Sequence, residues 1–292
     1  MYSRNITISP STTIINIQIR IDLTVSNFDY SKVKEDGGDI RFYDTDHNLL
    51  SYYIESWNSF GNSILWVKIP LIGTDSISIE YGNLFLSSLS NGDSTFVLFD
   101  DFNSFSLDLL KWTQTGIVSQ SSGEVTMKGS VGSGITSISK YSNVSVRFYG
   151  RLTRYLGNAA IGGLYASWDD SQADFRMESA TVHICRTRTG GVAGTRTDVT
   201  IPDYHNIYTL YEVYYILGMQ SSFYVNDLNV SNLISNTLNP SIDLPVRFFA
   251  YTNGEVRVDW VHVRNDDGTI RTLNYGNEIP ICNNLMCSLL IQ

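Results

Sequence analysis

The chain has 292 residues, of which 42% are hydrophobic and 17% charged, and it carries a formal net charge of −9. This hydrophobic share supports packed cores and excludes global disorder. The acidic balance disfavours a nucleic-acid partner, because nucleic-acid binding requires a concentrated basic face. No apolar run approaches the length of a bilayer span, so no membrane insertion is expected.

The amino end enters a strand pattern at once, without the charged and apolar segments of a signal peptide. We therefore expect one of two histories for this chain. Either a leader has been removed, or the protein reaches its working place by another route, such as assembly into a particle released on lysis.

Residues 15–25 alternate apolar and polar side chains almost without interruption. A period of two puts successive side chains on opposite faces of a strand, so this segment is expected to bury one face. The same pattern recurs along the chain and predicts an all-β protein of two β-sandwich domains. In the first domain, residues 1–90, it predicts strands at 4–8, 14–25, 39–43, 49–55, 64–69 and 76–81, and one helical turn within 27–33.

A polar stretch at residues 87–94 has the composition of a flexible connector and marks the domain boundary. The second domain, residues 91–276, is predicted to be a larger two-sheet jelly roll, and residues 277–292 a tail that is either a docking strand or a loose end. The predicted elements are a short helix at 106–112, with Ser106 as its N-cap, and strands at 124–128, 144–152, 160–168, 175–178, 181–186, 196–201, 208–217, 222–225, 246–251 and 255–264.

The one basic cluster of the chain consists of Arg186, Arg188 and Arg196, around two glycines. Glycine pairs between alternating segments are typical of tight turns. We therefore interpret this cluster as the solvated tip of a hairpin.

Four blocks of the first region, in this order, carry a family resemblance: DGGDIRFYD at 36–44, LSYYIESW at 50–57, WVKIP at 66–70 and IEYGN at 79–83. On these residues the region resembles the DUF2341 family, a small β domain of archaeal and bacterial surface proteins. The family has no established activity, so the resemblance implies architecture rather than chemistry.

Three blocks of the second region carry another resemblance: FDDFN at 99–103, LDLLKW at 107–112 and VDWVHVR at 258–264. They resemble the concanavalin A-like (laminin-G-like) jelly rolls that often follow a DUF2341 domain. Such architectures resemble extracellular adhesion and carbohydrate-binding proteins, and also surface proteins of viruses that infect archaea.

Enzymes of the concanavalin A-like fold that cleave glycans place two or three carboxylates at i, i+2 and i+4 on one strand. The nearest set here, Asp169, Asp170, Asp174 and Glu178, departs from this spacing and is expected to span a loop. The histidines, serines and cysteines show no metal-ligating or nucleophilic spacing. We therefore expect no catalytic residues and no enzyme, with a glycan-cleaving hydrolase of divergent site as the alternative.

Asp101 and Asp259 are candidate ligands of a structural calcium ion, since jelly rolls of this kind often tie their first and last strands through one. The alternative is that both are outward residues hydrogen-bonded to backbone; no other cofactor is expected. Cys282 and Cys287 are close enough in sequence to form a disulfide, and a pair of unlinked thiols is the alternative. Cys185 is expected to be a small buried apolar residue.

The features best suited to a ligand lie beside a glycine-rich stretch and combine aromatic rings with carboxylates. They are Tyr155, Tyr165, Trp168, Asp169 and Asp170. Aromatic planes stack on sugar rings and carboxylates accept hydroxyl hydrogen bonds, so this set predicts a glycan site. The alternative is that the aromatic residues belong to the core.

The tyrosines of residues 204–215 are expected to divide between the core and a flat outer face, which would also fit the interface of a homo-oligomer. Taken together, these features predict a non-catalytic extracellular or virion-surface protein. Its expected role is structural assembly, recognition of a glycan or cell surface, or both. The partners would be that ligand, other copies of the chain, or structural proteins of a particle.

Overall fold

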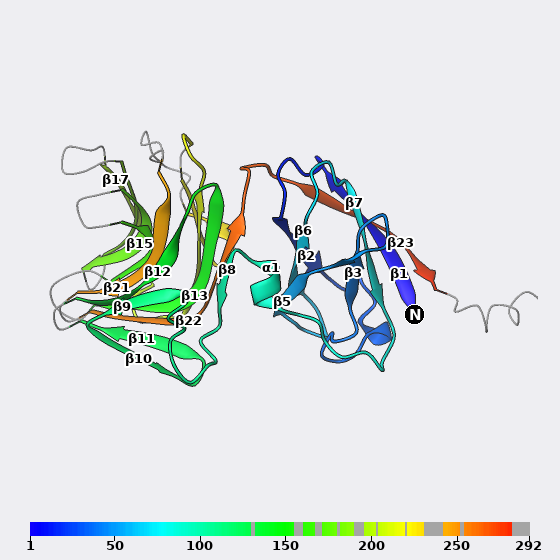
Figure 1. Cartoon of the computed structure of the whole chain (residues 1–292), viewed down its shortest axis with the longest axis horizontal. Coiled ribbons are helices and arrows are strands. Elements are labelled where there is room, and N and C mark those ends of the chain that lie inside the picture. Colours follow the sequence, from blue (N-terminus) through cyan, green and yellow to red (C-terminus); the bar gives the residue numbers. More distant parts are fainter. Residues whose placement is uncertain are drawn as a thin grey trace, which may run out of the picture. The chain divides into compact units, whose positions relative to one another are not determined.

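The computed structural model describes residues 1–129, 132–154, 160–166, 171–179, 182–189, 196–202, 204–219, 221–230, 242–251 and 254–281. The chain divides into two compact units, a smaller one of Met1–Phe96 with Thr269–Gln292 and a larger one of Val97–Gly268 (Figure 1). Both consist almost wholly of antiparallel strands, as the alternation predicts. In the part of the chain just defined, no helix has both the length and the apolar character that crossing a bilayer requires.

The smaller unit contains a five-stranded sheet, in the order β23-β1-β7-β3-β4, and a three-stranded sheet, in the order β2-β6-β5. Isoleucines of both sheets, such as Ile21 and Ile79, are fully buried in one core. The strands are β1 (Tyr2–Ser9), β2 (Ile17–Leu23), β3 (Arg41–Tyr43), β4 (Leu49–Leu50), β5 (Tyr52–Ser56), β6 (Ser63–Ile69), β7 (Ser76–Tyr81) and β23 (Thr272–Pro280), with a 3-10 turn at Tyr30–Lys32 and a short helix α1 (Gly92–Thr95).

Strand β2 is shorter than its alternating sequence predicts. Its pairing with β6 runs from Ile17 to Leu23, and the flanking Ile15 and Val25 are 59% and 72% exposed. The alternating pattern shows which side chains can share a face, but the length of β2 is set by the length of β6, with which it pairs.

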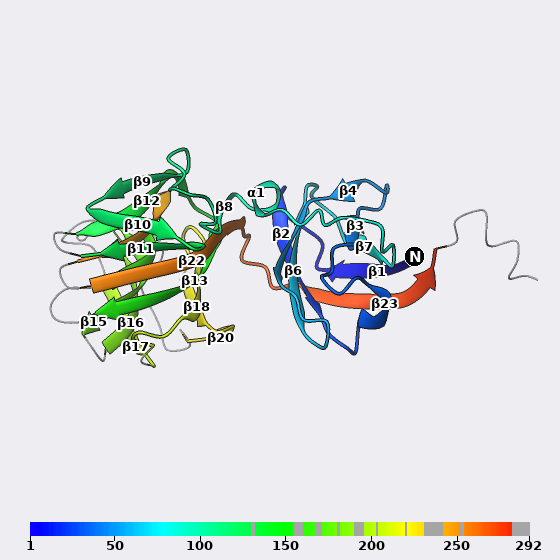
Figure 2. The same ribbon diagram turned by 90° about the horizontal axis from the view of Figure 1, so that it is seen from below.

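Strand β23 joins the two ends of the chain within the smaller unit. It pairs with β1 over its whole length, and Figure 2 shows the two lying side by side. Leu273 and Tyr275 pack against the core of this unit, and the carboxylate of Glu278 accepts hydrogen bonds from Tyr81 and Lys32. The segment that the sequence division splits between the second domain and the tail is therefore one strand of the first unit.

The larger unit is a sandwich of two sheets. Its eight-stranded sheet has the order β10-β11-β22-β13-β18-β19-β20, with β8 also paired to β22, and its seven-stranded sheet has the order β17-β16-β15-β14-β21-β12-β9. The strands are β8 (Leu98–Asp100), β9 (Trp112–Thr115), β10 (Ile117–Ser121), β11 (Glu124–Lys128), β12 (Ser133–Tyr141), β13 (Val144–Arg154), β14 (Ala160–Tyr165), β15 (Gln172–Ser179), β16 (Val182–Arg188), β17 (Arg196–Ile201), β18 (Thr209–Tyr215), β19 (Ser222–Val225), β20 (Leu228–Asn229), β21 (Leu244–Ala250) and β22 (Gly254–Asn265).

Aromatic side chains from both sheets meet in the core of the larger unit. Phe148 of β13 packs edge-on against Phe248 of β21, with ring centroids 4.9 Å apart. Tyr211 of β18 lies 4.9 Å from Phe175 of β15. Because strand side chains alternate, the residues between these point away from the core, onto what we call the outer face of each sheet.

The helix predicted at residues 106–112 is wrong, because the structure has a turn there. The backbone carbonyl of Asp108 accepts from the amides of Lys111 and Trp112, and its carboxylate accepts from the amide of Leu110. Trp112 then begins β9, fully buried, and its indole N–H donates to Asp100 Oδ2 at 2.7 Å. Burial of the indole in a strand outweighs the weak helix preference of this short segment.

Candidate functional site

The outer face of the seven-stranded sheet carries a row of charged side chains. In the register of the sheet, Arg247 of β21 stands opposite Gly163 of β14, Gly163 opposite Asp174 of β15, and Asp174 opposite Arg186 of β16. Directly paired residues of antiparallel strands project to the same side. Their chain neighbours Phe175, Cys185 and Phe248 lie in the core, so the row belongs to the outer face.

A buried ion pair occupies the middle of this face. Arg176 Nε donates to Asp174 Oδ1 and Arg176 Nη2 to Asp174 Oδ2, both at 2.7 Å, and Nη2 also donates to Gln172 Oε1 at 2.7 Å. None of the three side chains is exposed to solvent. A two-point guanidinium–carboxylate contact is the geometry in which a buried charge pair is best compensated.

Tyr165 lies between two guanidinium groups. The guanidinium carbon of Arg176 is 5.6 Å from the centroid of its ring, and that of Arg247 is 5.2 Å away. Arg247 also lies over Phe249, at 4.3 Å, and Phe249 packs edge-on against Tyr251. Burial, together with the neighbouring Tyr251 hydroxyl, raises the pKa of Tyr165, so its phenol remains protonated.

The side chains just described form one set, which we call the polar face. It consists of Tyr165, Gln172, Asp174, Arg176, Arg186, Arg247, Phe249 and Tyr251. Arg247 and Tyr251 are half-buried, and the others are buried. Arg247 and Tyr251 are therefore the members of the polar face whose side chains are accessible to solvent.

The structure places only one of the five predicted ligand residues. Tyr165 lies on the polar face, fully buried among charged groups rather than in the sandwich core. Tyr155, Trp168, Asp169 and Asp170 lie outside the described residues.

Two expectations about neighbouring segments need correction. The set Asp169, Asp170, Asp174 and Glu178 was expected to span a loop before a strand at 175–178. Asp169 and Asp170 lie outside the described residues, and β15 begins earlier than predicted, at Gln172, so that Asp174 lies in the strand. Arg186 and Arg188 were expected at a solvated hairpin tip, but they lie in β16 and are only 3% and 9% exposed. In both segments polar and apolar side chains alternate, as in Gln172, Ala173 and Asp174, and this alternation is typical of a strand. The polar composition alone suggested a solvent-exposed segment, but the described polar side chains of these strands are buried.

The predicted calcium ligands Asp101 and Asp259 both lie in the described part of the larger unit. Asp101 Oδ1 accepts from the amide of Asn103 at 3.2 Å, which is the role of a turn residue. Burial, with the negative charges of Glu124 and Asp101, raises the pKa of Asp259. Within the described ranges, no three His, Cys, Asp or Glu side chains are grouped to hold a metal ion, and calcium binding at Asp101 and Asp259 stays a prediction.

Of the three cysteines, only Cys185 lies within the described residues. Cys185 is buried in the core of the larger unit, as expected. Cys282 and Cys287 lie outside the described residues.

The outer face of the eight-stranded sheet holds a second charged cluster, whose members compensate one another. Arg147 Nη1 donates to Glu212 at 2.9 Å and to Asp227 at 2.7 Å. Arg264 donates to the same Glu212 at 2.9 Å and to Asp266 at 2.6 Å. Because each of its cations has two carboxylate partners, this network needs no ligand and is best explained as structural.

The tyrosines of residues 204–215 divide between core and surface. Tyr211 and Tyr215 are fully buried in the core. Tyr208 and Tyr214 are only partly buried; the ring of Tyr214 lies 4.9 Å from the guanidinium of Arg264, on the outer face of the eight-stranded sheet.

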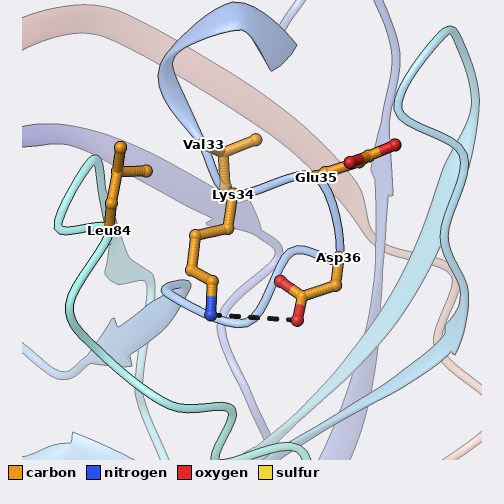
Figure 3. Close-up of a pocket in the computed structure, with 5 residues that line it drawn as sticks. All are labelled: Val33, Lys34, Glu35, Asp36 and Leu84. Carbon is orange, nitrogen blue, oxygen red and sulfur yellow. Dashed lines mark ion pairs between the residues drawn. The ribbon is translucent and has the colours of Figure 1, made fainter.

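The smaller unit contains a hollow of about 590 Å³, shown in Figure 3. Lys34 and Asp36 form an ion pair of 3.8 Å across it, at the entrance to the loop that carries Gly37. A Cβ on Gly37, whose φ is +68°, would approach the ring of Trp57 to 2.9 Å, and the indole N–H of Trp57 donates to the carbonyl of Glu35 at 2.7 Å. The residues of this hollow thus hold a loop against Trp57, and we assign them no chemistry.

Comparison with known proteins gives a family match for part of the chain. Residues 36–115 match the family described as "Domain of unknown function (DUF2341)", which agrees with the resemblance seen in the sequence. A curated protein of Methanocaldococcus jannaschii, called uncharacterized, is 23% identical over 84% of this chain and 49% of its own length. The chain therefore spans about half the length of this relative.

Solved structures similar to this chain are jelly-roll glycan-cleaving proteins. A β-glucanase of Bacillus licheniformis is 13% identical, with a TM-score of 0.48 over 57% of this chain and 97% of its own. A lichenase from a mouse hindgut metagenome is 11% identical, with a TM-score of 0.46 over 57% and 98%. A structure from work on mucin-degrading endo-acting O-glycanases of the human gut microbiota is 14% identical, with a TM-score of 0.47 over 59% and 100%. At these identities the likeness is one of fold.

This comparison corrects one expectation from the sequence. The chain was expected not to be an enzyme, yet the similar solved structures are named as glucanases, a lichenase and O-glycanases. That expectation is contradicted and we withdraw it.

Proposed function

We propose that the larger unit binds a carbohydrate chain on the polar face of its seven-stranded sheet. The observation that carries the proposal is the arrangement of Tyr165 between Arg176 and Arg247, beside the carboxylate of Asp174. Sugars are recognised by aromatic rings together with a few well-placed charged and polar groups, which orient their hydroxyls. The polar face supplies both kinds of group within one sheet.

The rigidity of this face also supports the proposal. The Asp174–Arg176 pair is closed by two hydrogen bonds, and Phe249 packs directly under Arg247. A site whose side chains are fixed before binding loses less conformational entropy when the ligand arrives. By contrast, the charged network around Glu212 on the opposite sheet compensates itself.

Binding is tested by titrating oligosaccharides into the full chain in a calorimeter, after a glycan-array screen. We expect Tyr251→Ala to weaken binding about tenfold or more, since Tyr251 is an accessible aromatic ring of the face. Tyr149→Ala is the matched control, because Tyr149 is a half-buried tyrosine on the outer face of the other sheet. Equal losses in both variants, or no glycan bound by the wild-type chain, would contradict the proposal.

Cleavage of the bound glycan is a second candidate function, favoured by one observation. Strand β15 carries two carboxylate residues, Asp174 and Glu178, with Arg176 between them, and they would make a site that diverges from the i, i+2, i+4 set of jelly-roll glycosidases. Asp174, held in a two-point ion pair with Arg176, would be the nucleophile or base. Glu178 would then be the general acid.

Cleavage is tested by incubating the chain with mixed polysaccharides and measuring new reducing ends. We expect turnover that is abolished in Glu178→Gln and retained in Asp243→Asn, an exposed aspartate of the same unit. Binding without any new reducing ends would remove this second candidate and leave the first in place.

We propose further that the protein works outside the cell, on an envelope or a virion surface, alone or in several copies. Its low charged share and the carbohydrate ligand proposed above support this location. Electron microscopy of the native source with a labelled antibody tests it, and a label found only inside intact cells would contradict it.

A further inference from the structure

Arg247 is half-buried and, within the described residues, lacks the carboxylate partners that the buried Arg147, Arg176 and Arg264 have. Arg147, Arg176 and Arg264 each donate to carboxylates at 2.6–2.9 Å. Arg247 makes a single hydrogen bond, from Nη1 to the carbonyl of Ala166 at 3.4 Å, and has no carboxylate partner among the described residues. A cation withdrawn from water without a counter-ion is costly, so this site favours an anion.

The surroundings of Arg247 withdraw it from water and fix its orientation. Burial lowers its pKa, against smaller opposing effects of Tyr165 and Tyr251. Its guanidinium lies over Phe249 and beside Tyr165, and its Nε is buried without a hydrogen-bond partner in the described part of the chain. The plane of the guanidinium is therefore set by aromatic stacking, and within the described residues it donates one hydrogen bond, to the carbonyl of Ala166.

The residue opposite Arg247 on the neighbouring strand is a glycine. Gly163 stands opposite Arg247 in the sheet and separates it from Asp174, two strands away, or roughly 10 Å across the ladder. The φ of Gly163 is +141°, and a Cβ there would lie 2.9 Å from the carbonyl of Ala173. Neither the backbone conformation nor the space admits a side chain at position 163, so no side chain of β14 stands between Arg247 and Asp174 in this row.

We propose, resting on the carbohydrate function proposed above, that the polar face takes an acidic glycan and that Arg247 binds its carboxylate or sulfate group. Planar guanidinium forks match the geometry of such oxyanions. Tyr251 then contacts the ring of the same sugar. Carboxylated and sulfated sugars present the same charge to Arg247, and the experiment separates them.

The test is calorimetric titration of the full chain with four probes of similar length. They are oligogalacturonate and oligoalginate as carboxylated ligands, a carrageenan oligosaccharide as a sulfated ligand, and a mixed-linkage β-glucan oligosaccharide as the neutral one. We expect at least one acidic class to bind about tenfold or more tightly than the neutral probe, and its affinity to fall as salt is raised.

Variants at one position assign the effect to Arg247. We expect Arg247→Met to weaken the acidic ligand about 10- to 100-fold and to leave neutral binding unchanged. Arg247→Lys keeps the positive charge but lacks the planar guanidinium, and it should weaken carboxylate binding severalfold. It replaces Arg247→Met in the test if the methionine variant does not fold. Arg20→Met, a partly exposed arginine of the smaller unit, is the control.

The outcomes separate this inference from the function on which it rests. Equal affinity for neutral and acidic probes, or acidic binding unaffected by either Arg247 variant, overturns the role of Arg247 and leaves carbohydrate binding standing. A wild-type chain that binds none of the four probes, nor any other glycan of an array, overturns both.

Discussion

Asp174 and Arg176 lie two residues apart on strand β15 and hold each other in a two-point ion pair, with both contacts at 2.7 Å. Side chains at i and i+2 of a strand share a face, so the pair is preorganised by the backbone alone. Both groups have lost all contact with water. Because water does not reach either group, each charge is compensated by the other.

Asp174→Asn is expected to lower the free energy of unfolding of the larger unit by about 3–5 kcal/mol, because it leaves the buried guanidinium of Arg176 with a neutral partner. The measurement is equilibrium denaturation in urea. Asp243→Asn, at an exposed site, should change stability by less than about 0.5 kcal/mol. If the two variants unfold alike, the carboxylate of Asp174 is not a buried counter-ion.

A second prediction concerns acid, and it rests on Glu212. Burial alone raises the pKa of Glu212, but the positive charges of Arg264 and Arg147 and the hydrogen bond from Ser145 outweigh it, and the net pKa lies below the ordinary value. The folded state thus binds protons less readily than the unfolded state. The stability from this group is fully present above the ordinary pKa of glutamate and is lost as the pH falls through the lower, folded value.

Wild type and Glu212→Gln should therefore converge in acid. We expect the wild type to be the more stable by about 3 kcal/mol or more near neutral pH, because the variant leaves two buried guanidinium groups undercompensated. The difference should shrink as the pH is lowered below about 4. Urea denaturation at a series of pH values measures it, and a difference independent of pH would contradict the assigned role of the ion pairs.

Much of the fold can be predicted from alternation, and the failures have physical causes. Strands β11, β13 and β22 appear where the pattern places them. Strand β23 was missed because Gly276 and polar neighbours interrupt its pattern, and its assignment depends on β1, which lies at the other end of the chain. A single sequence shows which residues can form a strand but not which partner completes it.

The candidate site was predictable only in part, for the same reason. Tyr165 could be chosen because aromatic residues beside glycines suggest a ligand site. Arg247, by contrast, looks like any outward residue of a strand. Its neighbours Gly163 and Asp174 come from strands far away in the sequence, and only the register of β14, β15 and β21 brings them together.

Gly134→Ala is predicted to disturb the polar face from the neighbouring strand β12. Gly134 stands opposite Phe249 in the sheet, and an added Cβ would collide with the ring of Phe249 and approach the carbonyl of Phe248 to 2.6 Å. We expect a loss of about 1–3 kcal/mol in the free energy of unfolding. Since Phe249 supports Arg247, binding of the acidic ligand should weaken as well.

The control for this substitution is Gly276→Ala, also at a strand glycine. The nearest atom to its added Cβ, the carbonyl oxygen of Asn5, is 3.4 Å away, so it should be neutral or slightly stabilising. Similar losses of stability in the two variants would mean that the close contact with Phe249 is not what excludes a side chain from position 134.

The motif of the DUF2341 match has a structural explanation that can be tested at Asp39. Its side chain is buried; Oδ1 accepts from the amide of Lys34 at 2.9 Å, and Oδ2 accepts from the amide of Gly82 at 2.7 Å. It thereby joins two loops of the smaller unit that are distant in sequence. Asp39→Asn replaces one acceptor with a donor, which then faces an amide N–H with no hydrogen bond available.

We expect Asp39→Asn to destabilise the smaller unit by about 1–3 kcal/mol, the cost of one unsatisfied buried donor. Hydrogen exchange should become faster at Lys34 or Gly82 and remain unchanged in the larger unit. Asp46→Asn, at an exposed aspartate of the same unit, is the matched control and should leave both amides protected. Unchanged protection in Asp39→Asn would show that other contacts hold these loops, and the motif would then need an explanation beyond the stability of the fold.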